Sequence, residues 1–122
     1  IQSTLRLAGE ADVTFVGIGD LGAQAPLFLD GFITESELKS LQKAGGVGEI
    51  VGWAFDRDGK FIEGLTNERV ASAPIPSRET SLVVALAMGE RKLPGLLAAV
   101  TRRLVNGLIT DEKTATGLLA GS

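Results

Sequence analysis

The 122-residue sequence contains no cysteine, no histidine and no tyrosine. Without cysteine the chain can form neither a disulfide framework nor a thiolate metal site, which fits a reducing compartment such as the cytoplasm. Without histidine it lacks the commonest general base and the commonest metal ligand, so hydrolase chemistry of the Ser-His type is excluded. We therefore expect no metal ion and no cofactor.

Long apolar runs and an excess of positive charge are also missing. No stretch approaches the length of a membrane span and no signal peptide is recognisable, so we expect no membrane partner. The net charge is −3, which gives this chain no overall attraction for nucleic acid. Its hydrophobic fraction of 44% and charged fraction of 22% are those of one ordinary globular domain.

The most informative stretch lies between residues 82 and 112. Residues 82–87 form a continuous apolar run, which predicts a strand buried on both faces. Gly89 permits a tight turn, and apolar residues recur at helical spacing after Lys92. A second short apolar segment, residues 108–109, leads into a helix start at Thr110-Asp111. This order of strand, helix, strand and helix predicts a βαβ unit of a parallel sheet.

The turn after the first of these strands is a candidate ligand site. In open α/β sheets, ligands bind beyond the carboxyl ends of the strands. Lys92 would lie there, near a helix N-terminus that favours a phosphate or carboxylate. A solvated surface lysine is the alternative, and the spacing leaves both open.

A glycine-rich segment follows an earlier predicted strand at residues 12–16. Residues 17–22 read GIGDLG, which has the spacing of the dinucleotide fingerprint. Pro26 falls where the phosphate-binding helix would continue, and no second strand ending in an acid follows at the expected distance. This disfavours a dinucleotide site. The segment is then either a turn whose backbone N–H groups face a small ligand, or a purely structural turn.

Thr34 and Glu37 form a capping box at the start of a predicted helix, which ends at the glycine pair 45–46. Residues 47–55 predict a strand, residues 56–59 a tight turn and residues 60–62 the returning arm of a hairpin.

Glu49 is flanked by Gly48 and by apolar residues within that predicted strand. A carboxylate in this setting could accept hydrogen bonds from sugar hydroxyls, or it could cap a backbone turn. The spacing does not decide between the two.

Four segments taken together resemble the C-terminal effector-binding half of the SorC family of bacterial sugar-binding transcriptional regulators. No one of them is specific alone, but their order and spacing match over nearly the whole chain. The segments are residues 11–19, residues 47–50 with 55–59, Gly89-x-x-Lys92, and residues 108–115.

The resemblance implies an α/β fold: a Rossmann-like three-layer sandwich with a mostly parallel sheet, similar to sugar-phosphate isomerase and CoA-transferase-like folds. Residues 1–122 would be the C-terminal part of the effector domain, and a sheet cut there would expose an edge that associates with another chain or another copy. DNA would be a partner only through an N-terminal helix-turn-helix domain that is absent from this sequence. Members of the family are commonly dimers or tetramers.

The resemblance also implies a sugar, polyol or phosphosugar as the effector. The positions expected to line its pocket are Gly17, Ile18, Gly19, Asp20, Glu49, Gly89 and Lys92. The family usually carries two glycines at the last turn, whereas Met88 here replaces the first. That departure argues against close approach of a phosphate and indicates a different or unphosphorylated effector.

Two further functions are compatible with the residues. A sugar-phosphate isomerase would use Glu49 as the base and Lys92 as an electrostatic stabiliser, but no set of catalytic residues converges at recognisable spacing, so we do not expect an enzyme. An oligomerisation module that has lost ligand binding is the other alternative.

Overall fold

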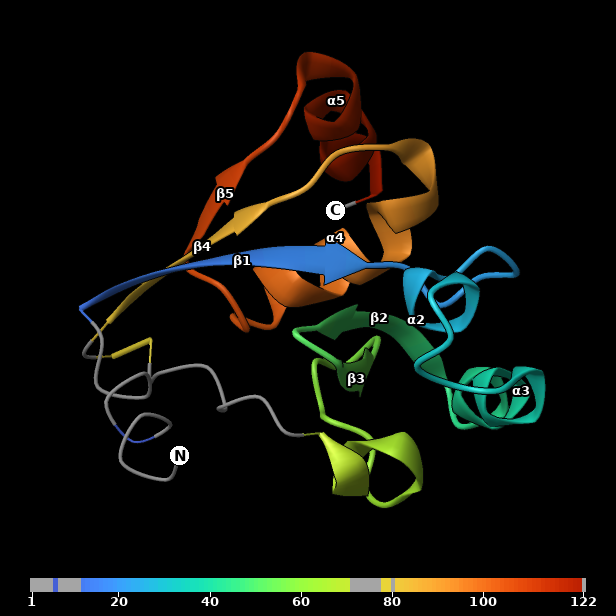
Figure 1. Ribbon diagram of the computed structural model, residues 1–122. Coiled ribbons are helices and arrows are strands. Elements are labelled where there is room, and N and C mark those ends of the chain that lie inside the picture. Colours follow the sequence, from blue (N-terminus) through green and yellow to red (C-terminus); the bar gives the residue numbers. More distant parts are fainter. Residues whose placement is uncertain (1–5, 7–11, 71–77, 80, 122) are drawn as a thin grey trace.

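The computed structural model describes Arg6 and residues 12–70, 78–79 and 81–121. Five strands form one mixed sheet in the order β3-β2-β1-β4-β5 (Figure 1). The strands are β1 (Val13–Gly19), β2 (Gly46–Ile50), β3 (Trp53–Asp56), β4 (Leu82–Leu86) and β5 (Gly107–Ile109). β4 pairs in parallel with both β1 and β5, which confirms the predicted βαβ unit. β2 pairs antiparallel with β1 and with β3, so only one half of the sheet is parallel.

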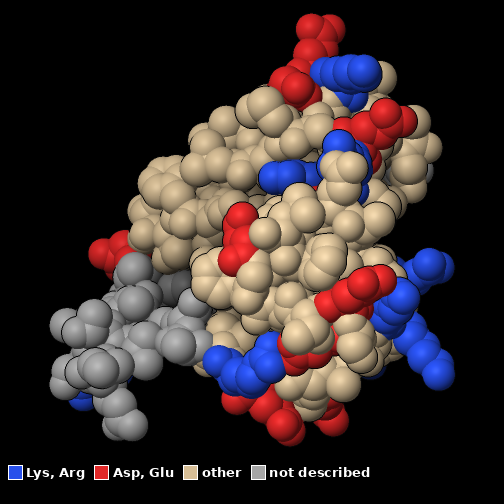
Figure 2. All heavy atoms as spheres, turned by 45° about the vertical axis from the view of Figure 1, so that its right-hand side comes forward, with Lys and Arg blue, Asp and Glu red and all other residues tan. Residues whose placement is uncertain are grey.

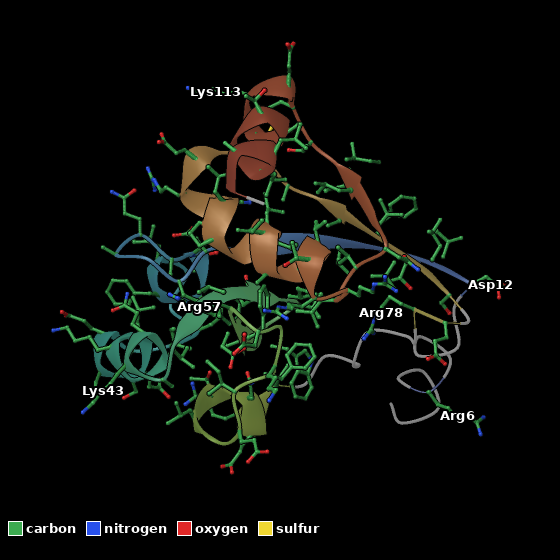
Figure 3. The ribbon with its side chains drawn as sticks, turned by 180° about the vertical axis from the view of Figure 1, so that it is seen from behind. Arg6, Asp12, Lys43, Arg57, Arg78 and Lys113 are labelled. Carbon is green, nitrogen blue, oxygen red and sulfur yellow. The ribbon has the colours of Figure 1, made fainter. Side chains whose placement is uncertain are left out.

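The helices are α2 (Pro26–Leu29), α3 (Glu35–Lys43), α4 (Leu93–Thr101) and α5 (Glu112–Gly121), with two 3-10 segments, η1 (Leu65–Arg69) and η2 (Glu90–Lys92). Helix α4 lies behind β1 in Figure 1 and in front of it in Figure 3, so it covers one face of the sheet. Helix α5 packs on α4. None of the helices in the described ranges is long and apolar enough to cross a membrane.

Two clusters of buried residues hold these elements together. The main one lies between the sheet and α4 and includes Val16, Ile18, Phe55, Val83 and Leu96. A smaller one lies under α3 and includes Leu21, Ile33, Leu38, Leu41 and Ala54.

The local signals for the ends of helices are confirmed. Thr34 N donates to Glu37 Oε1 (2.9 Å) and Glu37 N donates to Thr34 Oγ1 (3.1 Å), which is the reciprocal capping box at the start of α3. Gly45 ends that helix with φ +91°. Asp111 Oδ1 accepts from Thr114 N (2.8 Å) and so starts α5.

The predicted strand at residues 47–55 is wrong in one respect, because it is two strands rather than one. β2 and β3 are joined by a two-residue turn in which Val51 (φ +46°) and Gly52 (φ +94°) are both left-handed. The later turn at residues 56–59 is present, since Gly59 N donates to Asp56 O (2.9 Å). Beyond it only an isolated bridge forms, between Phe55 and Phe61. The hairpin therefore closes earlier than the sequence indicated.

One face of the sheet is open in the part of the chain that the structure describes. β4 was expected to be buried on both faces, but Leu82 is 46% exposed and Leu86 47% exposed. The pairing register puts Phe15 of β1 and Ile109 of β5 on the same side, and these are 61% and 51% exposed. We call this the open face. Figure 2 shows a broad uncharged surface there, seen obliquely. The described residues thus form two of the three predicted layers, the sheet and the helices on its other face.

β1 also has a half-open edge. Its pairing with β2 involves only Ile18 and Gly19, whereas residues 13–17 pair with β4. Within the described ranges, residues 13–17 therefore have a partner strand on one side only. Exposure of this edge and association through it stay predictions.

Candidate functional site

The carboxylate of Glu49 lies over the backbone of Gly19, at the carboxyl end of β1. The two residues are opposite each other in the β1–β2 pairing. A Cβ atom on Gly19 would lie only 2.1 Å from Glu49 Oε1, so glycine is the residue that leaves room for the carboxylate. The register also places Glu49 on the open face, on the same side as Phe15.

Glu49 is an unusual carboxylate because it is only 9% exposed. Burial raises the pKa of Glu49, and the negative charge of Asp20 raises it further. A hydrogen bond from Gly52 N to Oε2 (2.7 Å) and the positive charge of Lys92 act in the opposite direction. The structure therefore brings Asp20 and Lys92 within electrostatic reach of Glu49.

Asp20 and Gly17 lie near Gly19 in the chain, at the carboxyl end of β1. Asp20 is buried, and its Oδ2 accepts from Gly22 N (3.2 Å). A Cβ atom on Gly17 would meet nothing within 4 Å, so the surface above Gly17 is open to a ligand. Ile18 points the other way: it is 1% exposed and lies in the main core near Gly95. Only the backbone of Ile18 is therefore on the ligand side.

Lys92 and Gly89 form the second part of the predicted site. Lys92 is partly buried and is the N-cap residue of α4, where the sequence placed it. Gly89 has φ +119°, but its N–H donates to Thr114 Oγ1 of α5 (3.0 Å). The Gly89 amide is thus already bonded within the protein, so it is a poor candidate for binding an anion.

A cavity that no sequence pattern indicated opens beside Glu49. Its volume is about 610 Å³, and it lies between α2, the β2–β3 turn and η1. Thr66 and Arg69 of η1 contribute to its wall. The weak pattern after residue 64 carried no signal for η1, because this segment is held by a side chain, Asn67, that bonds to distant backbone groups.

Acidic side chains do not gather into a metal site here. Among the described residues, no group of three Asp or Glu side chains is placed so as to hold a metal ion.

Comparison with known proteins identifies relatives over nearly the full length of the chain. A family model described as "Putative sugar-binding domain" matches residues 1–120. The erythritol catabolism regulatory protein EryD of Brucella abortus is 37% identical, and the match covers 98% of this chain and 38% of EryD. The transcriptional regulator LsrR of Klebsiella pneumoniae is 33% identical, and the match covers 98% of this chain and 38% of LsrR. The chain thus spans about two fifths of the length of these regulators.

Solved structures show the same fold. A DeoR family transcriptional regulator from Listeria monocytogenes superposes with a TM-score of 0.87 at 25% identity, over 97% of this chain and 48% of that one. The full-length sorbitol operon regulator SorC from Klebsiella pneumoniae superposes with a TM-score of 0.84 at 26% identity. The match covers 97% of this chain and 39% of SorC. These relatives are transcriptional regulators rather than enzymes.

Proposed function

This chain belongs to the sugar-binding domain family of bacterial SorC-type transcriptional regulators, and we propose that it binds the small-molecule effector of such a regulator. The names of relatives refer to erythritol, sorbitol and deoxyribonucleosides. A sugar, a polyol or one of their phosphates is therefore the ligand class we propose for this chain.

The observation that carries the proposal is the Glu49 carboxylate held over Gly19 on the open face, with Asp20 and Lys92 in electrostatic reach. Hydrogen bonds from hydroxyls to a charged acceptor are among the stronger ones in proteins. A polyol above Gly17 would donate to Glu49 and Asp20, and Lys92 would donate to a hydroxyl or phosphate oxygen. Backbone N–H groups of residues 17–19 would complete the contacts.

Regulation would follow from a difference in affinity between two arrangements of the regulator. An effector that binds one arrangement more tightly shifts the population toward it. In this proposal another domain of the parent protein contacts DNA in the cytoplasm and reads the shift. The half-open edge of β1 supports contact with further polypeptide, including a second copy in a dimer or tetramer.

Thermal-shift measurements on the full-length parent regulator test the proposal. The panel contains erythritol, sorbitol, deoxyribose and their phosphates. A ligand at a hundredfold excess over Kd adds about 2.7 kcal/mol of stability, which is readily measured. The shift should disappear in Lys92→Ala and persist in Lys113→Ala, because Lys113 projects into solvent from α5 (Figure 3).

An absence of any shift across the panel would refute effector binding. The alternative of an oligomerisation module without a ligand would then take its place. A shift that both lysine variants retain would leave sugar binding in place but remove Lys92 from the site.

A further inference from the structure

The cavity beside Glu49 has the make-up of a ligand-binding pocket. Its volume of about 610 Å³ is within the range of small-molecule sites, which are mostly apolar with a few polar groups. The walls are largely apolar and include Pro26, Leu27, Ile33, Val51 and Val70. Glu49 lies in its wall as well, so the cavity adjoins the site proposed above.

Thr66 contributes a polar group that the protein itself does not use. The residue is 5% exposed, and its Oγ1 is shielded from water and bonds to no described residue. A buried hydroxyl without a partner destabilises a fold, and valine would fill the same volume without that cost. Thr66 lies in the wall of the cavity, so a ligand bound there is a candidate partner for this hydroxyl.

Two strained residues adjoin this cavity. Val51 in its wall has φ +46°, and Leu65, next to Thr66, has φ +50°. Branched or bulky residues rarely adopt a positive φ. Such conformations concentrate at ligand sites, where the surrounding structure enforces them.

The charges around the cavity indicate which part of a ligand it accepts. Its carboxylates, Asp30 and Glu49, repel an anion. Arg69, the cation among the described lining residues, forms an ion pair with Glu37 and also donates to Phe32 O (3.5 Å). A phosphate is therefore disfavoured in this cavity, whereas neutral hydroxyls can donate to the carboxylates.

We propose that the cavity receives the uncharged, hydroxyl-bearing end of the effector and that Thr66 hydrogen-bonds to it. The opposite end of the ligand, including any phosphate, then points toward Lys92. This inference rests on the proposed function, and it makes the η1 segment a determinant of which polyol binds.

Isothermal titration of the full-length parent regulator with erythritol, sorbitol and their phosphates tests the inference. Thr66→Val removes the hydroxyl and keeps the shape. It should weaken the binding of every probe that binds by about tenfold, the loss expected for one hydrogen bond, without lowering the melting temperature of the free protein. Thr116→Val is the matched control, since the exposed Thr116 hydroxyl lies on α5 and donates to Glu112 O (2.9 Å).

Val51→Trp provides a second variant that narrows the cavity from an exposed position already in the left-handed region. This substitution should weaken the binding of sorbitol more than the binding of the shorter erythritol. The inference is overturned if both variants bind all probes like wild type while Lys92→Ala loses binding; the proposed function would survive that result. If no probe binds the wild-type chain, both proposals fail.

Discussion

Asn67 allows a quantitative test of what holds η1 in place. Its Oδ1 accepts from Ala54 N (2.8 Å), and its Nδ2 donates to Ala54 O (3.0 Å) and Ile62 O (2.7 Å). The residue is 8% exposed, so water cannot replace these bonds in a truncated variant. At about 1 kcal/mol for each bond, Asn67→Ala should lower the free energy of unfolding by about 3 kcal/mol.

Asn106 provides a control with the same number and kind of bonds at an exposed position. It accepts from Val83 N (2.6 Å) and donates to Arg78 O (3.2 Å) and Ser81 O (3.0 Å). The bonds to Arg78 O and Ser81 O are exposed, so water can replace them in the variant and only the bond from Val83 N is lost. Asn106→Ala should therefore cost only about 1 kcal/mol.

Urea unfolding of both variants, with a check that the m-value is unchanged, measures the difference. If Asn106→Ala lowers the free energy of unfolding as much as Asn67→Ala does, or more, the argument that burial determines the loss of stability is refuted. Asn67→Asp sharpens the test, because it directs a carboxylate at two carbonyl oxygens in a buried site. Its pKa would be raised, so this variant should be least stable at neutral pH and regain stability as the pH falls.

Two further predictions concern the site and its support. Because burial raises the pKa of Glu49 above its ordinary 4.5, the wild type gains stability from protonation at acid pH and loses it as the pH rises through the raised pKa. The melting temperature of Glu49→Gln should therefore equal that of the wild type near pH 4 and exceed it at pH 7. A lower melting temperature of the variant at pH 7 would contradict the raised pKa. Gly48→Ala should cost about 1–3 kcal/mol, since its Cβ would lie 3.2 Å from both Gly19 O and Gly95 Cα. Gly17→Ala, with no atom within 4 Å of its Cβ, should change stability by less than about 0.5 kcal/mol in the same denaturation assay.

Features that depend on neighbouring residues were predictable from the sequence. The capping box of Thr34 and Glu37 and the start of α5 at Asp111 need only side chains within one helical turn, and both are present. The strand at residues 82–86 followed from its apolar run. A continuous apolar run predicts a strand that is buried on both faces, so Leu82 and Leu86 were expected to be buried. They are exposed because the described helices cover only one face of the sheet.

Features that depend on distant pairing were not predictable. The contact of Glu49 with Gly19 arises from the register between β1 and β2, which no local pattern specifies. The turn at Val51 was missed because a β-branched residue with positive φ is rare. The bond from Gly89 N to Thr114 Oγ1 joins the turn to a helix much later in the chain, and no local pattern indicated it; the place of Gly89 in a ligand site stays a prediction.

The parallel pairing of β1 with β4 has a consequence for variation in chain length. The strands are neighbours in the sheet, yet the whole antiparallel half, with α2, α3 and η1, is inserted between them in the sequence. The loop-closure entropy of such a long connection grows only logarithmically, and doubling its length would cost about 0.6 kcal/mol. Insertions and deletions in this half can therefore reshape the cavity beside Glu49 while the parallel βαβ unit that carries Lys92 keeps its geometry.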